Sequence, residues 1–334
     1  GEMVTYDNTD DGLGWWTRVS HVIAGAAYGY PHDYKQRPEL VRPAILDQGG
    51  GSPCGNLFYR EAAWPEPWKS GAYFAEWGKG AVRRFDFEQR GATLGVQGFA
   101  DLLTTGEAQA FRPLDVAESP DGRWMWVSDW NYNGWTSPTQ AGRLWRVRRA
   151  NDDGSQSSAM AALPETDSEL LTVLQEPSYR RRLRAQQALV DGGTIETVLL
   201  LADYLVADAP DRAKAHAWCA LEELSRYGSV ADDDQRTRRL QLWRTTDVLL
   251  SQDVPETQAW IARALARRTD ASLASVGALL RSPHAIVRRE AATALANPAF
   301  SARAGERDEY VVEALAQEQD EWVRHALQRA IQRG

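Results

Sequence analysis

The pattern of hydrophobic and polar residues changes near residue 150. Before it, short runs alternate between apolar and polar positions, most clearly between Phe111 and Trp130. There an extended run leads into the turn sequence Ser-Pro-Asp-Gly at 119–122 and then into Trp-Met-Trp-Val-Ser at 124–128, which predicts an antiparallel hairpin. After it, Ala, Leu and Arg recur at helical spacing with few glycines. The chain therefore joins a β-rich part to a helical part.

The pattern of the first part predicts an all-β domain over residues 1–149. Strand-like segments, each bounded by Gly, Pro or Asp, lie at 15–22, 56–59, 72–76, 81–87, 116–118, 124–128 and 142–147. The hairpin ends on an Asp-Trp corner, a feature of β-propeller blades. A blade takes roughly 40–50 residues, so this part holds about three blades, whereas closed propellers have about four or more. We therefore expect a partial, open β-propeller.

Residues 150–166 are small and polar and indicate a linker. Beyond it a motif recurs, in which two apolar residues are followed by an arginine and then by spaced alanines. Its arginines are Arg182, Arg288 and Arg324, at offsets of 106 and 36 residues. An offset of 106 is about three periods of 35, the length of a paired-helix repeat. Residues 167–334 are accordingly predicted to form a HEAT-like α-solenoid of about four or five repeats.

Composition supports this division and narrows the class of protein. Ten of the 14 Trp and most of the Gly and Pro lie before Ala150, as a sheet domain with many tight turns requires. The net charge of −8 comes from 16 basic and 18 acidic residues before Ala150, and from 22 and 28 after it. Neither part is a natural polyanion binder, so we expect no nucleic-acid partner.

Membrane segments, cysteines and the N-terminal residues say little about function. The longest apolar run, 198–202, stops at Asp203, far short of the roughly 18 residues of a membrane span. Cys54 and Cys219 lie in different predicted domains, which excludes a disulfide framework and a Cys-x-x-Cys metal or haem motif. The first residues contain no signal peptide and look like the middle of a domain, so we expect a truncated N-terminus.

One acidic loop is a candidate metal site. Asp7 to Gly12 resembles the first half of a calcium loop, with Asp7 and Asp11 as candidate ligands. Arg18 stands where the bidentate acid of an EF-hand would follow, so an EF-hand is excluded. A propeller-type calcium site that uses backbone carbonyls and a plain acidic surface loop both stay open.

Two long loops carry candidate substrate-binding residues. One contains Tyr28, Tyr30 and His32, and the other, 49–55, contains Ser52. Long loops on a rigid β scaffold often line a pocket, although these loops could equally pack at the rim. His21 could be a catalytic base, but its apolar neighbours favour a structural histidine.

Arg112 precedes the first strand of the hairpin, where its planar cation could grip a carboxylate. Asp115 and Trp130 lie at the same end of the hairpin and are further rim candidates. The alternative is an Arg-Asp pair that joins neighbouring blades through Asp115 or Asp129. The basic cluster at 180–184 indicates a solvated helix face.

Several short motifs in the first part carry a family resemblance. They are Tyr-Gly-Tyr-Pro at 28–31, Gly-Ser-Pro-x-Gly at 51–55, Trp-Pro at 64–65, Trp-Gly-Lys-Gly at 77–80, the segment 112–116, Ser-Pro-Asp-Gly at 119–122 and Asp-Trp at 129–130. In this order they resemble the C-terminal part of glucose/sorbosone dehydrogenase propellers. The large bacterial "membrane-bound dehydrogenase" type, whose propeller is followed by HEAT repeats, is the most similar. The resemblance covers about 45% of the chain.

This resemblance implies a periplasmic or extracellular sugar or alcohol dehydrogenase that uses pyrroloquinoline quinone (PQQ) with calcium. Arg112 falls on the first arginine of the family's quinone clamp, while Leu114 replaces the second. Gly78 aligns with the quinone-binding lysine, and Lys79 is its neighbour. The catalytic histidine belongs to blades upstream of this chain, so we expect a fragment without catalytic competence of its own. The alternative is a non-catalytic scaffold that binds a carbohydrate or, on its HEAT surface, a protein partner.

Overall fold

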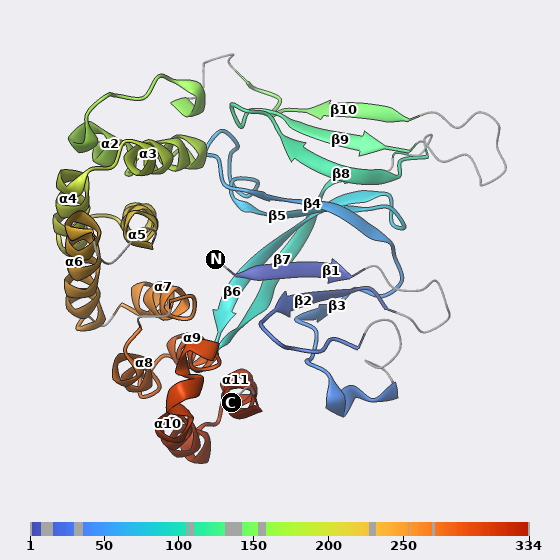
Figure 1. The fold of residues 1–334 in the computed structure, drawn as a ribbon. Helices are drawn as coiled ribbons and strands as arrows, with labels where there is room; N and C mark the ends of the chain where they lie inside the picture. Colours follow the sequence, from blue (N-terminus) through green and yellow to red (C-terminus); the bar gives the residue numbers. More distant parts are fainter. Residues whose placement is uncertain are drawn as a thin grey trace. The chain divides into compact units, whose positions relative to one another are not determined.

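The computed structural model describes residues 2–7, 16–29, 36–104, 106, 110–130, 142–152, 158–226, 232–252, 254–268 and 271–332. The chain divides into two compact units, residues 1–160 and 161–334. The first contains the strands and the second the α-helices of the described residues, as Figure 1 shows. The boundary falls within the stretch 150–166 that was predicted as a linker.

The first unit is built from three small antiparallel sheets of consecutive strands. They comprise β1 (Met3–Asp7), β2 (Arg18–Val22) and β3 (Leu46–Asp47); β4 (Pro53–Tyr59), β5 (Gly71–Glu76), β6 (Ala81–Arg90) and β7 (Thr93–Thr104); and β8 (Pro113–Glu118), β9 (Met125–Asp129) and β10 (Arg143–Val147). Short 3-10 turns lie at Pro38–Leu40 and Ser158–Met160. No sheet of the described residues closes into a barrel.

Strand β5 of the four-stranded sheet is buried on both faces, and its alternate side chains enter two different hydrophobic clusters. Tyr73 belongs to one hydrophobic cluster, which includes Val116 and Val127 of the third sheet. Phe74 belongs to another, in which its ring and that of Phe85 meet the Tyr6 ring edge-on, at centroid distances of 5.6 Å each. All six residues of β5 are buried. The strand predicted at 72–76 therefore lies between β4 and β6 with both of its faces in the core.

The predicted hairpin is confirmed as β8–β9. Its register pairs Val116 with Val127, and the Gly122 N–H donates to the Ser119 carbonyl at 2.9 Å. Gly122 has a φ of +72°, a conformation that favours glycine at this turn position. The Tyr59 hydroxyl donates to the Gly122 carbonyl at 2.7 Å, which attaches the turn to the neighbouring sheet.

All seven predicted strands are present with shifted ends, but three strands were missed. The short strands β1 and β3 carry little pattern, while β7 contains Gly95 and Gly98. The β6–β7 pairing includes two register irregularities, so the apolar positions of β7 do not keep a strict period of two. The prediction that 49–55 holds no strand was wrong in part, because β4 begins at Pro53.

The second unit contains α2 (Asp167–Val173), α3 (Tyr179–Asp191), α4 (Ile195–Val206), α5 (Asp211–Arg226), α6 (Asp233–Leu250), α7 (Pro255–Leu265), α8 (Leu273–Leu279), α9 (Ala285–Leu295), α10 (Ala304–Gln317) and α11 (Glu321–Gln332), with a 3-10 turn at Pro298–Arg303. Helices two apart pack together, α3 with α5, α5 with α7, α7 with α9 and α9 with α11. On the other side α2 packs with α4, α4 with α6 and α8 with α10. The helices therefore stack in two rows.

The three arginines of the repeated motif make the same type of contact. Arg182 Nη1 donates to the carbonyls of Glu176 and Pro177, each at 2.7 Å. Arg288 Nη1 donates likewise to the carbonyls six and five residues before it, at 3.0 and 3.1 Å. Arg324 Nη1 donates to the Glu318 carbonyl, again six residues earlier, at 3.0 Å. The sequence repeat therefore corresponds to a repeated local structure.

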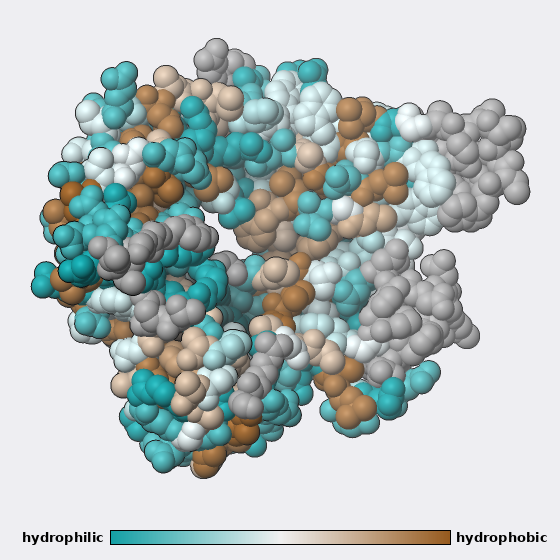
Figure 2. Space-filling view, viewed as in Figure 1, coloured by the Kyte–Doolittle hydropathy of each residue, from teal (hydrophilic) through white to brown (hydrophobic). Residues whose placement is uncertain are grey.

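In the described part of the chain no helix combines the length and apolar character needed to cross a bilayer. On the face drawn in Figure 2, hydrophilic and hydrophobic residues are interspersed over both units.

Candidate functional site

Four of the ten predicted site residues of the first unit flank the same ends of its strands. Ser52 precedes β4, Lys79 lies in the turn between β5 and β6, Arg112 precedes β8 and Trp130 follows β9. Antiparallel neighbours bring the start of one strand beside the end of the next. These motifs thus lie on loops at one end of the strands of the second and third sheets.

A buried glutamate ties two of these loops together. The Glu76 side chain accepts hydrogen bonds from the main-chain N–H of Ser52 and, at 2.7 Å, of Lys79. The Trp77 N–H donates to the Ser52 carbonyl at 2.9 Å. A Cβ on Gly78 would lie 2.8 Å from the Ser52 nitrogen, so only glycine allows this close approach. Glu76 was not singled out from the sequence, since a glutamate next to a Trp-Gly turn has no distinctive spacing, and Trp77 was noted only as part of the Trp-Gly-Lys-Gly motif and not as a site residue.

The Lys79 ammonium forms hydrogen bonds to residues of the first sheet and of the loop that follows it. Its Nζ donates to the Gln48 carbonyl at 2.8 Å and to the Tyr6 hydroxyl at 3.3 Å. Burial lowers the pKa of Lys79, and the nearby Glu76 carboxylate opposes this effect. Burial also raises the pKa of Tyr6 to about 12, which keeps its hydroxyl neutral. Lys79 thus links the first sheet to the second.

Arg112 lies on an aromatic surface. Its guanidinium carbon is 5.4 Å from the centroid of the Trp77 ring, and the Trp77 and Trp130 rings lie 5.9 Å apart at 47°. Arg112 Nη1 donates to the Phe111 carbonyl at 3.2 Å, and its Nε is buried without a hydrogen-bond partner. We call Arg112, Trp77 and Trp130 the Arg112 platform. It offers a cation with unused donor capacity beside two half-buried indoles.

The alternative prediction, an ion pair of Arg112 with Asp115 or Asp129, is not found in the structure. Asp129 accepts the main-chain N–H of Arg112 at 2.8 Å, while its carboxylate binds the guanidinium of Arg143 at 2.6 Å and the Trp145 indole N–H at 2.8 Å. Asp115 accepts the N–H of Val116 at 2.9 Å. Asp129 therefore positions the backbone of Arg112, and no acidic side chain of the described residues forms an ion pair with its guanidinium.

Tyr28 and His21 have structural contacts. The Tyr28 hydroxyl donates to the His21 carbonyl at 2.6 Å and accepts the Ile23 N–H at 2.8 Å. The His21 ring is fully buried, with Glu2 at 2.6 Å from Nε2 and Thr93 at 2.9 Å from Nδ1. The interpretation of His21 as a structural residue is confirmed. Tyr30 and His32 lie outside the described residues.

Asp7, a predicted calcium ligand, does not belong to a ligand cluster among the described residues. Asp7 Oδ2 accepts from Arg18 Nη2 at 3.3 Å and from the Ser20 hydroxyl at 3.5 Å. Burial raises the pKa of Asp7, and the Arg18 charge counteracts it. Asp11 lies outside the described residues. Across the ranges that the structure describes, no three His, Cys, Asp or Glu side chains gather in a way that could hold a metal ion.

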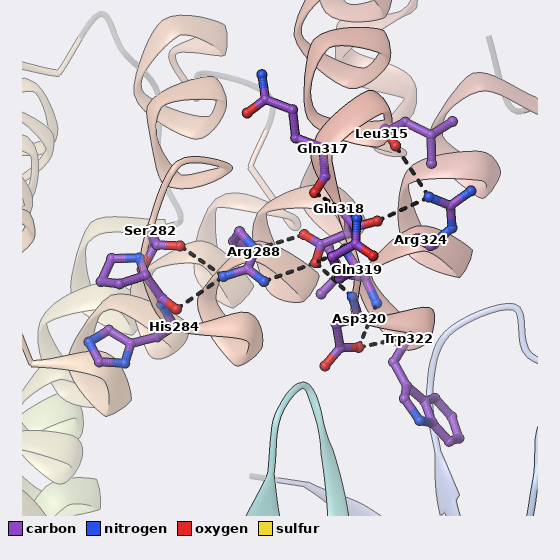
Figure 3. Close-up of polar contacts among 12 residues, drawn as sticks. Ser282, His284, Arg288, Leu315, Gln317, Glu318, Gln319, Asp320, Trp322 and Arg324 are labelled. Atoms are coloured by element: carbon purple, nitrogen blue, oxygen red, sulfur yellow. Dashed lines mark hydrogen bonds and ion pairs between the residues drawn. The ribbon is translucent and has the colours of Figure 1, made fainter.

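The second unit has a polar cavity of about 630 Å³ between α8, the start of α9, α10 and the α10–α11 connection. Arg288 is one of its lining residues, and Figure 3 shows its bidentate ion pair with Glu318, at 2.7 and 2.9 Å. Glu318 also accepts the N–H groups of Gln319 and Asp320. Burial tends to raise its pKa, but the hydrogen bond and charge of Arg288 and the N–H groups of Asp320 and Gln319 together hold the pKa below its usual range. Arg281 and Glu313 form an exposed pair at the cavity wall.

Comparisons with known proteins found only loose structural similarities. No protein-family profile and no curated protein matches the chain. Among solved structures, a Thermus thermophilus protein assigned as an oxidoreductase (glucose dehydrogenase) is similar at 19% identity over 43% of this chain and 41% of its own, with a TM-score of 0.31. An engineered protein is similar at 17% identity over 51% of this chain and 98% of its own, with a TM-score of 0.26. The chain thus spans less than half the length of the Thermus protein, and the likeness is a loose one.

Proposed function

We propose that the first unit is an arc of about three β-propeller blades of the glucose/sorbosone dehydrogenase type, and that the Arg112 platform binds a carbohydrate. The Arg112 guanidinium carries this proposal, because it lies on Trp77 and has, within the described ranges, no acidic partner and a buried Nε that lacks an acceptor. Indole faces suit the apolar face of a sugar ring, and a guanidinium suits hydroxyl or carboxylate oxygens. We place this binding in the periplasm or outside the cell, as the resemblance implies.

The described residues do not fit the quinone well. A ligand with three carboxylates needs several cations. Leu114, 39% exposed, stands where a second arginine would be required, and Lys79 donates to Gln48 and Tyr6. Calcium would need a carboxylate cluster that these residues do not form. The proposed ligand is therefore a neutral or singly charged sugar, and the chain acts as a binding fragment of a dehydrogenase-like protein.

The second unit is proposed to be a HEAT-like array that binds a protein partner. The repeated arginine contacts and the two rows of helices support this assignment. The 630 Å³ cavity between α8, α9 and α10 is a candidate docking point for polar side chains of that partner.

The experiment is isothermal titration of the whole chain with glucose, cellobiose and glucuronate, and separately with PQQ plus calcium. We expect saturable sugar binding that weakens at least about tenfold in Arg112→Ala, since hydrogen bonds to a charged group contribute about 1.5–3 kcal/mol. Arg236→Gln, an exposed arginine of α6, is the matched control. PQQ binding that is lost in Arg112→Ala would replace this proposal by a quinoprotein site. No binding of any ligand would refute the site altogether.

A further inference from the structure

Strand β10 is the open edge of the third sheet. It pairs with β9 on one side, from Arg143 opposite Asp129 to Val147 opposite Met125, and within the described sheet it has no neighbour on the other. An edge strand presents unpaired N–H and C=O groups that can accept another strand. The main chain of β10 is thus a possible template for strand pairing.

The side chains of β10 divide between two faces. Arg143 and Trp145 turn to Asp129, and Val147 packs against the hydrophobic core. The alternate residues Leu144 and Arg146 point the other way, and Leu144 is 66% exposed. Because successive side chains alternate, Arg148 beyond the strand end continues this outward row.

The outward arginines are ordered by aromatic rings. The Arg146 guanidinium lies 4.3 Å from the centroid of the Trp124 ring and 5.8 Å from that of Trp126, its cross-strand partner. The Arg148 guanidinium lies 5.4 Å from the Trp124 ring. Stacking fixes these long side chains and leaves their in-plane donors available.

These two cations have no acid to neutralise them. Arg143 pairs with Asp129 and Arg149 approaches Asp152 at 3.8 Å, whereas neither Arg146 nor Arg148 forms an ion pair with a described residue. Both are exposed. Arg146 and Arg148, which no described acid compensates, make this edge locally positive although the whole chain has a net charge of −8.

This charge selects among the strands that could pair with β10. A second copy of β10 would bring arginine rows together and would be repelled. An acidic strand would meet the arginines with opposite charge. We propose that β10 binds an extended acidic peptide segment by strand addition, with Glu or Asp at alternate positions beside Arg146 and Arg148.

The test uses a fluorescein-labelled peptide of alternating Glu and Thr, titrated with the whole chain and followed by fluorescence anisotropy at low and moderate salt. A second peptide, with every Thr replaced by Pro, keeps the charge and removes half of the main-chain donors. We expect saturable binding of the first peptide and at least tenfold weaker binding of the second. The double variant Arg146→Gln/Arg148→Gln should weaken binding about three- to tenfold, and Arg236→Gln should not.

The outcomes separate this proposal from others. Equal binding of both peptides would mean attraction by charge alone, and unchanged binding by the double variant would mean another site; either overturns it. Polygalacturonate that binds where the peptide does not would make this a glycan surface and would overturn it as well. Arg112→Ala should leave peptide binding unchanged, so failure of the Arg112 platform and failure of strand addition can be distinguished. Far-UV circular dichroism checks that each variant is folded.

Discussion

Asp129→Asn should destabilise the first unit, because Asp129 is the acceptor on which three segments converge. Its side chain is fully buried and binds the Arg112 N–H, the Arg143 guanidinium and the Trp145 indole. Asparagine keeps one acceptor oxygen but presents an NH₂ donor to groups that are themselves donors. The substitution therefore removes the charge and creates a donor–donor clash.

The size of the effect follows from burial. Breaking a buried ion pair by removing one partner costs about 3–5 kcal/mol. The Arg143 side chain is 25% exposed, so part of its charge remains hydrated when Asp129 is neutralised. We therefore expect the lower end of this range, about 3 kcal/mol off the free energy of unfolding.

Urea unfolding of the whole chain measures this loss. Tryptophan fluorescence reports mainly on the first unit, which holds ten of the 14 Trp, and ellipticity at 222 nm reports mainly on the helices. The loss should appear in the fluorescence transition and leave the helical transition in place. The control is Glu313→Gln, whose pair with Arg281 is 55% and 64% exposed and should contribute less than about 1 kcal/mol. A loss for Asp129→Asn as small as that of the control would refute the reasoning.

Two further predictions concern the strand-end loops and the helices. Gly78→Ala should lower the free energy of unfolding in urea by about 1–3 kcal/mol, because its Cβ would meet the backbone of Gly51 and Ser52. The control is Gly98→Ala, which should be neutral because there is open space around its Cβ. Equal effects of the two substitutions would contradict the close approach at Gly78. Burial tends to raise the pKa of Glu290, but hydrogen bonds and charges from Arg263 and Arg289 hold it below its ordinary value of 4.5. Its stabilisation is therefore present above pH 4.5 and is lost as pH falls through the lowered pKa, so thermal melts at 222 nm should show a steeper acid loss for the wild type than for Glu290→Gln.

Local patterns predicted the fold better than they predicted the site. The Pro-Asp-Gly turn and the alternating residues after it are local signals, and the β8–β9 hairpin follows from them. The repeated arginine motif predicted repeated helices, and in the structure its three arginines make the same type of contact. By contrast, the direction of the Lys79 side chain depends on Gln48 and Tyr6, which come from the first sheet. The stacking of Arg146 on Trp124 depends on cross-strand register, which no local spacing reveals.

The repeated arginine contact also bears on how the helical unit can change in length. Arg182 and Arg288 find their Nη1 acceptors five and six residues earlier in the chain, within the same pair of helices. A helix pair inserted or deleted as a whole would therefore bring or remove both the guanidinium and its carbonyls together. An insertion between the arginine and the carbonyls five and six residues before it would separate them and leave the guanidinium or the carbonyls without a partner. Genetic duplication in whole pairs is thus the route along which such an array can grow without loss of stability at the new junction.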